Sequence, residues 1–154
     1  IMEFINWLEK KQKLKEILEK LNLKTKPLWG QMDSQQMIEH LSSVFEISNG
    51  VKKIEDLTQN IPYKKAEMFL KSKAEMPKNF SAKFLSKTPN KHKFKELNSA
   101  ISNLTLNIDK YNEFWRGKEQ TTCNHPVFGQ LNKEMWNKVH NKHITHHLKQ
   151  FDLI

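Results

Sequence analysis

Residues 132–151 read NKEMWNKVHNKHITHHLKQF, and this stretch decides the fold because its apolar and polar residues recur with the period of an α-helix. The side chain of Asn132 can cap the first turn. At roughly 100° per residue, one face of this helix collects aromatic and imidazole side chains. That face carries Trp136, His140, His143, His147, Gln150 and Phe151. The segment therefore predicts a long helix that turns histidines as well as apolar groups toward a helical core.

Histidines are concentrated in this helix, where four of the seven in the chain fall between residues 140 and 147. Burying several histidines is costly unless their ring nitrogens find partners. His143 and His147 are four residues apart, so their imidazoles lie on the same face and could bind one divalent cation. His40, in an upstream helical pattern, could supply a third nitrogen. A metal site is therefore the leading hypothesis, and hydrogen-bonded core histidines are the alternative.

Further helices are predicted on the N-terminal side. Apolar residues at helical spacing predict long helices over residues 2–21, 33–49 and 95–115, and a short helix over 62–74. Asp33 and Gln36 fit a capping box, and Asn49-Gly50 and Gly117 are typical helix stops. Residues 26–30, 76–80, 88–90 and 125–129 carry loop signals. We expect residues 1–154 to form one all-α domain, a four-helix bundle with a long crossover between the second and third long helices.

Lysine gives the chain a net charge of +9, which raises the question of nucleic-acid binding. Arg116 is the only arginine, although arginine is the preferred side chain for reading phosphates and guanine edges. The lysines are spread along the chain, with no concentrated basic segment beyond residues 10–15. A solvated lysine surface is therefore a better interpretation than a nucleic-acid partner.

Other sequence features limit where the protein is expected in the cell and which redox chemistry it can carry out. No apolar run reaches the roughly 20 residues that span a bilayer, and no signal-peptide pattern is present, so we expect no membrane partner and a cytoplasmic location. Cys123 is the only cysteine, which excludes an intrachain disulfide, and we interpret it as incidental. His92 and His125 lie in predicted loops.

Several motifs together resemble the DinB-like superfamily, and more narrowly a bacterial branch known only as a domain of unknown function. They are Trp29-Gly30-Gln31-Met32, residues 36–41 (QMIEHL), residues 76–80 (MPKNF), residues 125–129 (HPVFG) and residues 143–151 (HITHHLKQF). The resemblance covers nearly the whole chain from about Lys26, and its most specific part is the His-x-x-His-His-x-x-Gln element.

This resemblance implies a bundle of up-down-down-up topology with a divalent metal near one end. Its ligands would be one histidine of the second helix and two, four apart, of the last. Carried over to this chain, they are His40, His143 and His147. His140 and His146 would then be supporting residues.

Three neutral imidazoles without a fourth protein ligand describe an open site, as in catalytic rather than structural zinc centres. Imidazole suits Zn, Ni, Fe and Cu, with Zn or Ni the first expectation. Some relatives implied by the resemblance are S-transferases that use a low-molecular-weight thiol, and others are metal-dependent hydrolases. We therefore expect a metal-dependent enzyme acting on a small molecule. No acid or base stands out, since Glu39 and Glu46 only flank His40 in sequence. A non-catalytic, metal-stabilised or ligand-binding bundle, with a homodimer through a helical face, is the alternative.

Overall fold

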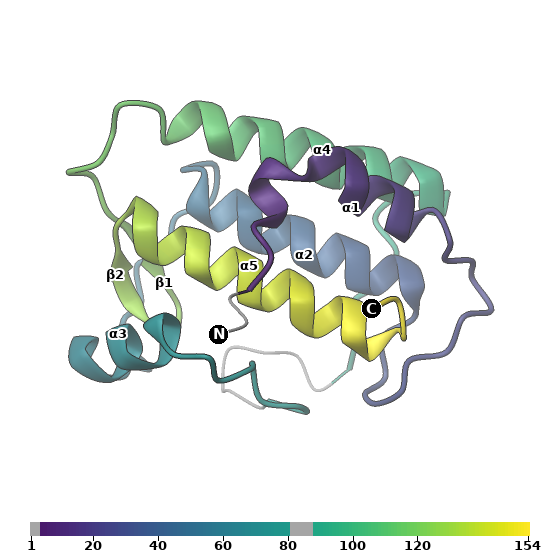
Figure 1. The fold of residues 1–154 in the computed structure, drawn as a ribbon, viewed down its shortest axis with the longest axis horizontal. Helices are drawn as coiled ribbons and strands as arrows, with labels where there is room; N and C mark the ends of the chain where they lie inside the picture. The colour runs from purple at the N-terminus through teal and green to yellow at the C-terminus, as the bar shows by residue number, and fades with distance from the viewer. Residues whose placement is uncertain (1–3, 81–87) are drawn as a thin grey trace.

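The computed structural model describes residues 4–80 and 88–154, and in them the chain is mostly helical. The described residues form five α-helices, one short 3-10 helix and one small sheet (Figure 1). The elements are η1 (Trp7–Glu9), α1 (Lys11–Leu18), α2 (Ser34–Ser48), α3 (Tyr63–Lys71), α4 (Leu97–Phe114), β1 (Cys123–His125), β2 (Gly129–Leu131) and α5 (Lys133–Gln150). Each described helix is too short or too polar to cross a membrane.

The helices enclose one hydrophobic cluster, in which α2 is the central element. α2 packs against α4 on one side and α5 on the other, while α1 lies on α4, and η1 and α3 lie on α5 (Figure 1). The largest side chains of the cluster are less than 2% exposed: Trp7, Phe45, Tyr111, Trp115 and Trp136. Because α2 and α5 are direct neighbours, side chains on their facing sides can meet.

The start and end of α2 follow the predicted local signals. The Asp33 carboxylate accepts the Gln36 backbone N–H at 2.8 Å, and the Gln36 side chain accepts the Asp33 backbone N–H at 2.9 Å. Gly50 follows the helix with a positive φ of 77°, where a Cβ would lie 2.8 Å from the Phe114 ring. α4 and α5 also lie close to their predicted ranges, and Asn132 caps α5 by accepting the Met135 N–H.

The helix predicted over residues 2–21 is wrong for the described residues before Lys11, and residues 2 and 3 lie outside the described part of the chain. Residues 7–9 form a 3-10 turn, Lys10 has a non-helical backbone, and α1 begins only at Lys11. The cause is a tertiary anchor. The Trp7 side chain is fully buried, its indole N–H donates to Thr145 Oγ1 at 3.0 Å and its backbone N–H donates to Asn141 Oδ1 at 2.9 Å. Docking of Trp7 on α5 therefore outweighs the local helical pattern.

The segment predicted as a loop over residues 125–129 contains the turn of a β-hairpin, and the two short strands on either side of this turn were not predicted. β1 and β2 pair antiparallel, with Cys123 opposite Leu131 and His125 opposite Gly129. His125 Nδ1 accepts the backbone N–H groups of Val127 and Phe128 at 3.0 and 3.1 Å. A histidine ring thus closes this turn.

Candidate metal centre

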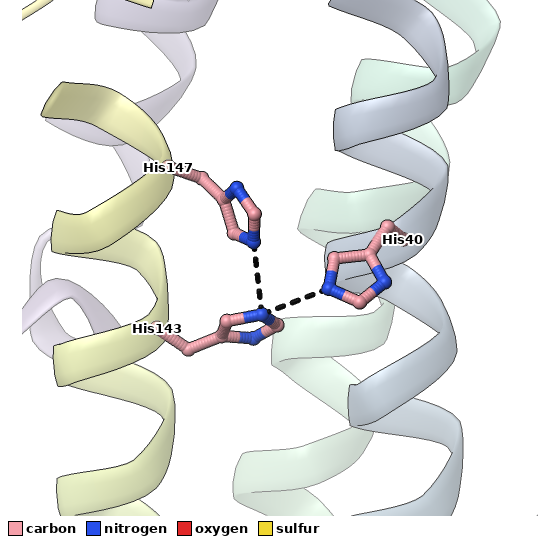
Figure 2. A group of neighbouring side chains, drawn as sticks. All are labelled: His40, His143 and His147. Atoms are coloured by element: carbon pink, nitrogen blue, oxygen red, sulfur yellow. Dashed lines mark hydrogen bonds between the residues drawn. The ribbon is translucent and has the colours of Figure 1, made fainter. Parts of the chain in front are cut away.

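His40 of α2 and His143 and His147 of α5 meet between the two helices, and we call these three residues the histidine triad. Figure 2 shows their rings pointing toward one another across the gap between α2 and α5. The Nε2 atom of His143 lies 2.9 Å from Nε2 of His40 and 3.0 Å from Nε2 of His147. Ring nitrogens of all three lie within 4.8 Å of one another, so the group could hold a metal ion. Residues 103 positions apart are thus brought together.

The contact of Nδ1, the second ring nitrogen of His147, shows which of its two nitrogens carries the proton. His147 Nδ1 lies 2.7 Å from Gln150 Oε1, and the Gln150 amide nitrogen donates to the Trp29 carbonyl at 2.9 Å. The second bond fixes the orientation of the amide, so its oxygen faces His147. An amide oxygen only accepts hydrogen bonds, so Nδ1 must carry the proton. In the neutral ring, Nε2 of His147 therefore carries no proton, and its lone pair points at His143.

Hydrogen bonds among neutral rings cannot satisfy both contacts of His143 Nε2. If this nitrogen carries a proton, the proton can point at His147 or at His40, but not at both. If it carries none, its lone pair faces the lone pair of His147 at 3.0 Å. One of the two contacts therefore lacks a linear hydrogen bond in either tautomer. A cation, by contrast, would accept a lone pair from each of the three nitrogens, so the residues fit a metal ion.

The electrostatics of the triad favour the uncharged rings that a metal requires. Burial lowers the pKa of His40 to about 4, from an ordinary value of 6.5. Burial also lowers the pKa values of His143 and His147 far below that value, and the neighbouring imidazoles add to the effect. His147 is 5% exposed, whereas His40 and His143 keep partial exposure. The triad is therefore neutral at physiological pH, as metal binding by imidazole requires.

No carboxylate or thiol joins the triad within the described ranges. Glu39, next to His40 in sequence, turns away and accepts the backbone N–H groups of Lys93 and Phe94 at 2.9–3.0 Å. Glu46 faces Lys93 Nζ at 3.7 Å. Both carboxylates flank His40 in sequence, but each is engaged away from the triad.

His140 and His146 also lie on α5, and they differ in their contacts. His140 is buried, stacks on Phe45 with ring centroids 3.8 Å apart, and lies 2.7 Å from Ser48 Oγ through Nε2. The Ser48 hydroxyl donates to a backbone carbonyl, so His140 is the donor in that contact. His146 packs edge-on against His147 and Trp29, and hydrogen-bonds to the Met76 backbone.

The other histidines and the cysteine lie outside the triad. His92 is exposed and contacts Asp33 Oδ2 at 2.7 Å. His125 holds the hairpin turn, and enclosure there lowers its pKa to about 3. Cys123 is half-buried in β1, and burial raises the pKa of its thiol.

Sequence reasoning missed a buried lysine that precedes His143 in α5. Lys142 is 2% exposed, and its ammonium donates to the carbonyls of Ser72, at 2.9 Å, and Ala74. The same ammonium lies 4.2 Å above the Phe4 ring and 5.0 Å above Phe69. It thus ties the segment after α3 to α5. Its one sequence signal is its place between buried positions of α5, which the common exposure of lysine overrides.

Comparison with known proteins supports assignment at the level of a family. No curated protein and no solved structure matches the chain. One family model, described as "Protein of unknown function (DUF1569)", matches residues 3–153. The match includes both helices of the triad and every motif of the sequence analysis, so the chain belongs to the DUF1569 family.

Proposed function

We propose that this protein binds one divalent metal ion through Nε2 of His40, His143 and His147. The observation that carries the proposal is the convergence of three neutral ring nitrogens whose contacts hydrogen bonds cannot all satisfy. The packing of α2 between α4 and α5 supports the same reading, because helical proteins build metal sites from side chains on facing helices.

The proposed centre is an open one, and its reaction is metal-dependent conversion of a small molecule. Three imidazoles leave at least one coordination position, and partial exposure of His40 and His143 leaves a way in for a substrate. When bound, Zn or Ni would lower the pKa of a water molecule or bind an incoming low-molecular-weight thiol as thiolate. The protein's part is to hold the three rings neutral and oriented. Thiol-dependent S-transfer and hydrolysis are the two reaction classes that this chemistry supports.

A non-catalytic, metal-stabilised bundle is the second candidate function. It is favoured by the engagement of Glu39 and Glu46 with backbone and lysine groups, since neither offers an acid or base at the triad. His147→Ala separates the two candidates. Loss of a metal-dependent activity with an unchanged melting temperature supports catalysis, whereas a large fall in the melting temperature supports a structural metal.

Elemental analysis of protein purified without chelator tests the metal itself. We expect about one divalent metal per chain, or uptake of one equivalent on titration with Zn²⁺ or Ni²⁺. The matched control is His92→Ala, which removes an exposed histidine outside the triad and should keep full uptake. A wild-type chain that holds no metal and takes up none would contradict the proposal.

A further inference from the structure

Gln150, the last residue of α5, joins the triad to the turn at residues 28–30. It is 3% exposed and uses three groups at once. Its side-chain oxygen faces His147 Nδ1 at 2.7 Å, and its side-chain nitrogen donates to the Trp29 carbonyl at 2.9 Å. Its backbone carbonyl accepts the Leu28 N–H at 2.7 Å. One residue therefore contacts both a proposed ligand and a turn more than 110 positions earlier in the chain.

We propose that Gln150 is the positioning residue of the metal centre and that the Leu28–Gly30 turn is part of that centre. This rests on the proposed function, because it assigns a role toward the same metal. The Gln150 amide keeps the proton of His147 on Nδ1 and so presents the Nε2 lone pair to the metal. A metal-bound histidine characteristically donates its other N–H to such an acceptor, which sets its tautomer and ring angle.

The turn is shaped to hold Gln150 in that orientation. Gly30 has a φ of +80°, which favours glycine, and a Cβ there would lie 2.9 Å from Gln150 Nε2. Any side chain at this position would therefore push the amide away from the Trp29 carbonyl, and with it the oxygen that faces His147. The absence of a side chain at Gly30 is what lets the turn and the amide approach so closely.

The turn is also held against α5 by a ring contact. The Trp29 ring packs edge-on against His146 with centroids 5.4 Å apart, and the Lys78 ammonium lies 4.3 Å over the same ring. His146 in turn packs against His147, centroid to centroid 4.9 Å. The turn therefore restrains the His147 ring twice, through the Gln150 amide and through the His146 ring.

Two measurements test the proposal. Long-range ¹H–¹⁵N spectra of the metal-free protein report which ring nitrogen of His147 carries the proton, and competition with a chromophoric chelator gives the affinity for Zn²⁺. We expect Nδ1–H at His147 in the wild-type chain. Gln150→Leu should lose this preference and weaken Zn²⁺ binding by about 10- to 100-fold. Gln150→Glu keeps an acceptor for His147, so it should keep the tautomer and bind Zn²⁺ more tightly than Gln150→Leu.

The role of the turn is tested by two glycine variants. Gly30→Ala places a Cβ against the Gln150 amide and should weaken Zn²⁺ binding toward the level of Gln150→Leu. Gly117→Ala is the matched control, because Gly117 also has a positive φ, +68°, but a Cβ there meets nothing within 4 Å. Both variants carry backbone strain, and only Gly30→Ala should change the Zn²⁺ affinity or the tautomer.

The outcomes separate this proposal from the proposed function. A wild-type chain that takes up neither Zn²⁺ nor Ni²⁺ overturns the proposed function and this proposal with it. Zn²⁺ uptake that Gln150→Leu leaves unchanged, or an Nε2–H tautomer of His147 in the wild-type chain, overturns this proposal alone. Equal loss of affinity in Gly30→Ala and Gly117→Ala overturns the part assigned to the turn.

Discussion

Two kinds of buried histidine lie along α5, and they differ in what their ring nitrogens meet. His140 stacks on Phe45 and donates from Nε2 to the Ser48 hydroxyl, so the protein alone satisfies this nitrogen. In the triad, Nε2 of His143 meets two other ring nitrogens, and the protein cannot satisfy both contacts. Burial lowers the pKa of His140 as it does those of the triad. Burial and a low pKa therefore do not identify a metal ligand in this helix, whereas the identity of the partners does.

The largest difference between the two kinds should appear in stabilisation by metal. Zn²⁺ at about 100 times its Kd should stabilise the wild-type fold by about 2.7 kcal/mol, because the ion binds only the folded state. For a chain of this size that raises the melting temperature by about 5–10 °C. His143→Ala removes the central nitrogen of the triad and should abolish the shift. His140→Ala should keep it. Thermal unfolding with and without Zn²⁺ measures both, and a full shift in His143→Ala would contradict the assignment.

Acid should destabilise the metal-free protein between pH 6.5 and about 3. His125 has a folded pKa of about 3 and an ordinary value of 6.5, so in this window the unfolded chain binds the proton and the folded chain does not. Its contribution to stability is therefore complete above pH 6.5 and is lost as the pH falls toward 3. His40, with a pKa of about 4, acts in the same direction. The summed effect should reach several kcal/mol, since a tenfold difference in proton affinity is worth about 1.4 kcal/mol.

The same acid titration, monitored by tryptophan fluorescence, should distinguish the two kinds of histidine when it is repeated with Zn²⁺. Bound metal excludes protons from the triad but not from His125 or His140, so it should move the acid midpoint of the wild-type chain to lower pH without removing the transition. The midpoint of His143→Ala should not respond to Zn²⁺. A wild-type midpoint that ignores Zn²⁺ would show that the triad does not bind it at acidic pH.

In the metal-free protein, His140 should contribute more to the stability of the fold than His143. His140→Ala removes a ring that stacks on Phe45 and lies 4.8 Å from the Tyr111 ring, and it leaves the Ser48 hydroxyl without its donor. We expect a loss of about 3 kcal/mol in the free energy of unfolding. His143 is less buried, and one of its two nitrogen contacts is unfavourable. Its alanine variant should lose less in urea unfolding of the metal-free protein. The opposite order would mean that the triad is already satisfied without a metal.

The parts of the molecule that sequence could predict are those with local causes. Asp33 with Gln36, and Asn132, start α2 and α5 by hydrogen bonds within one helical turn, and both starts are confirmed. The pairing of His143 with His147 is likewise a matter of helical period. His40 joins the triad only because α2 packs against α5. The bundle pattern and the family resemblance indicated this packing, but no local rule determines it.

Three of the features that sequence missed have partners far along the chain. The late start of α1 depends on Trp7 docking against Asn141 and Thr145. The burial of Lys142 depends on two carbonyls after α3, about 70 residues away. The side-chain bond from Gln150 to His147 spans three residues and follows helical geometry, but its second bond, to Trp29, does not. Local chemistry thus predicts which residues share a face, and tertiary contacts decide which of them are satisfied.

The smallest loss of stability is expected for the exposed histidine, His92, which serves as a reference for the two kinds of histidine in α5. His92 meets Asp33 Oδ2 at 2.7 Å, and both side chains are more than a third exposed. An exposed contact of this kind contributes about 0.2–1 kcal/mol, and the other Asp33 oxygen keeps its bond to the Gln36 N–H when His92 is removed. His92→Ala should therefore cost less than 1 kcal/mol and leave Zn²⁺ binding unchanged. Asp33→Ala removes the helix cap as well and should cost about 1 kcal/mol more. If urea unfolding ranks His92→Ala above Asp33→Ala, the contact with His92, not the capping box, holds the start of the helix that carries His40.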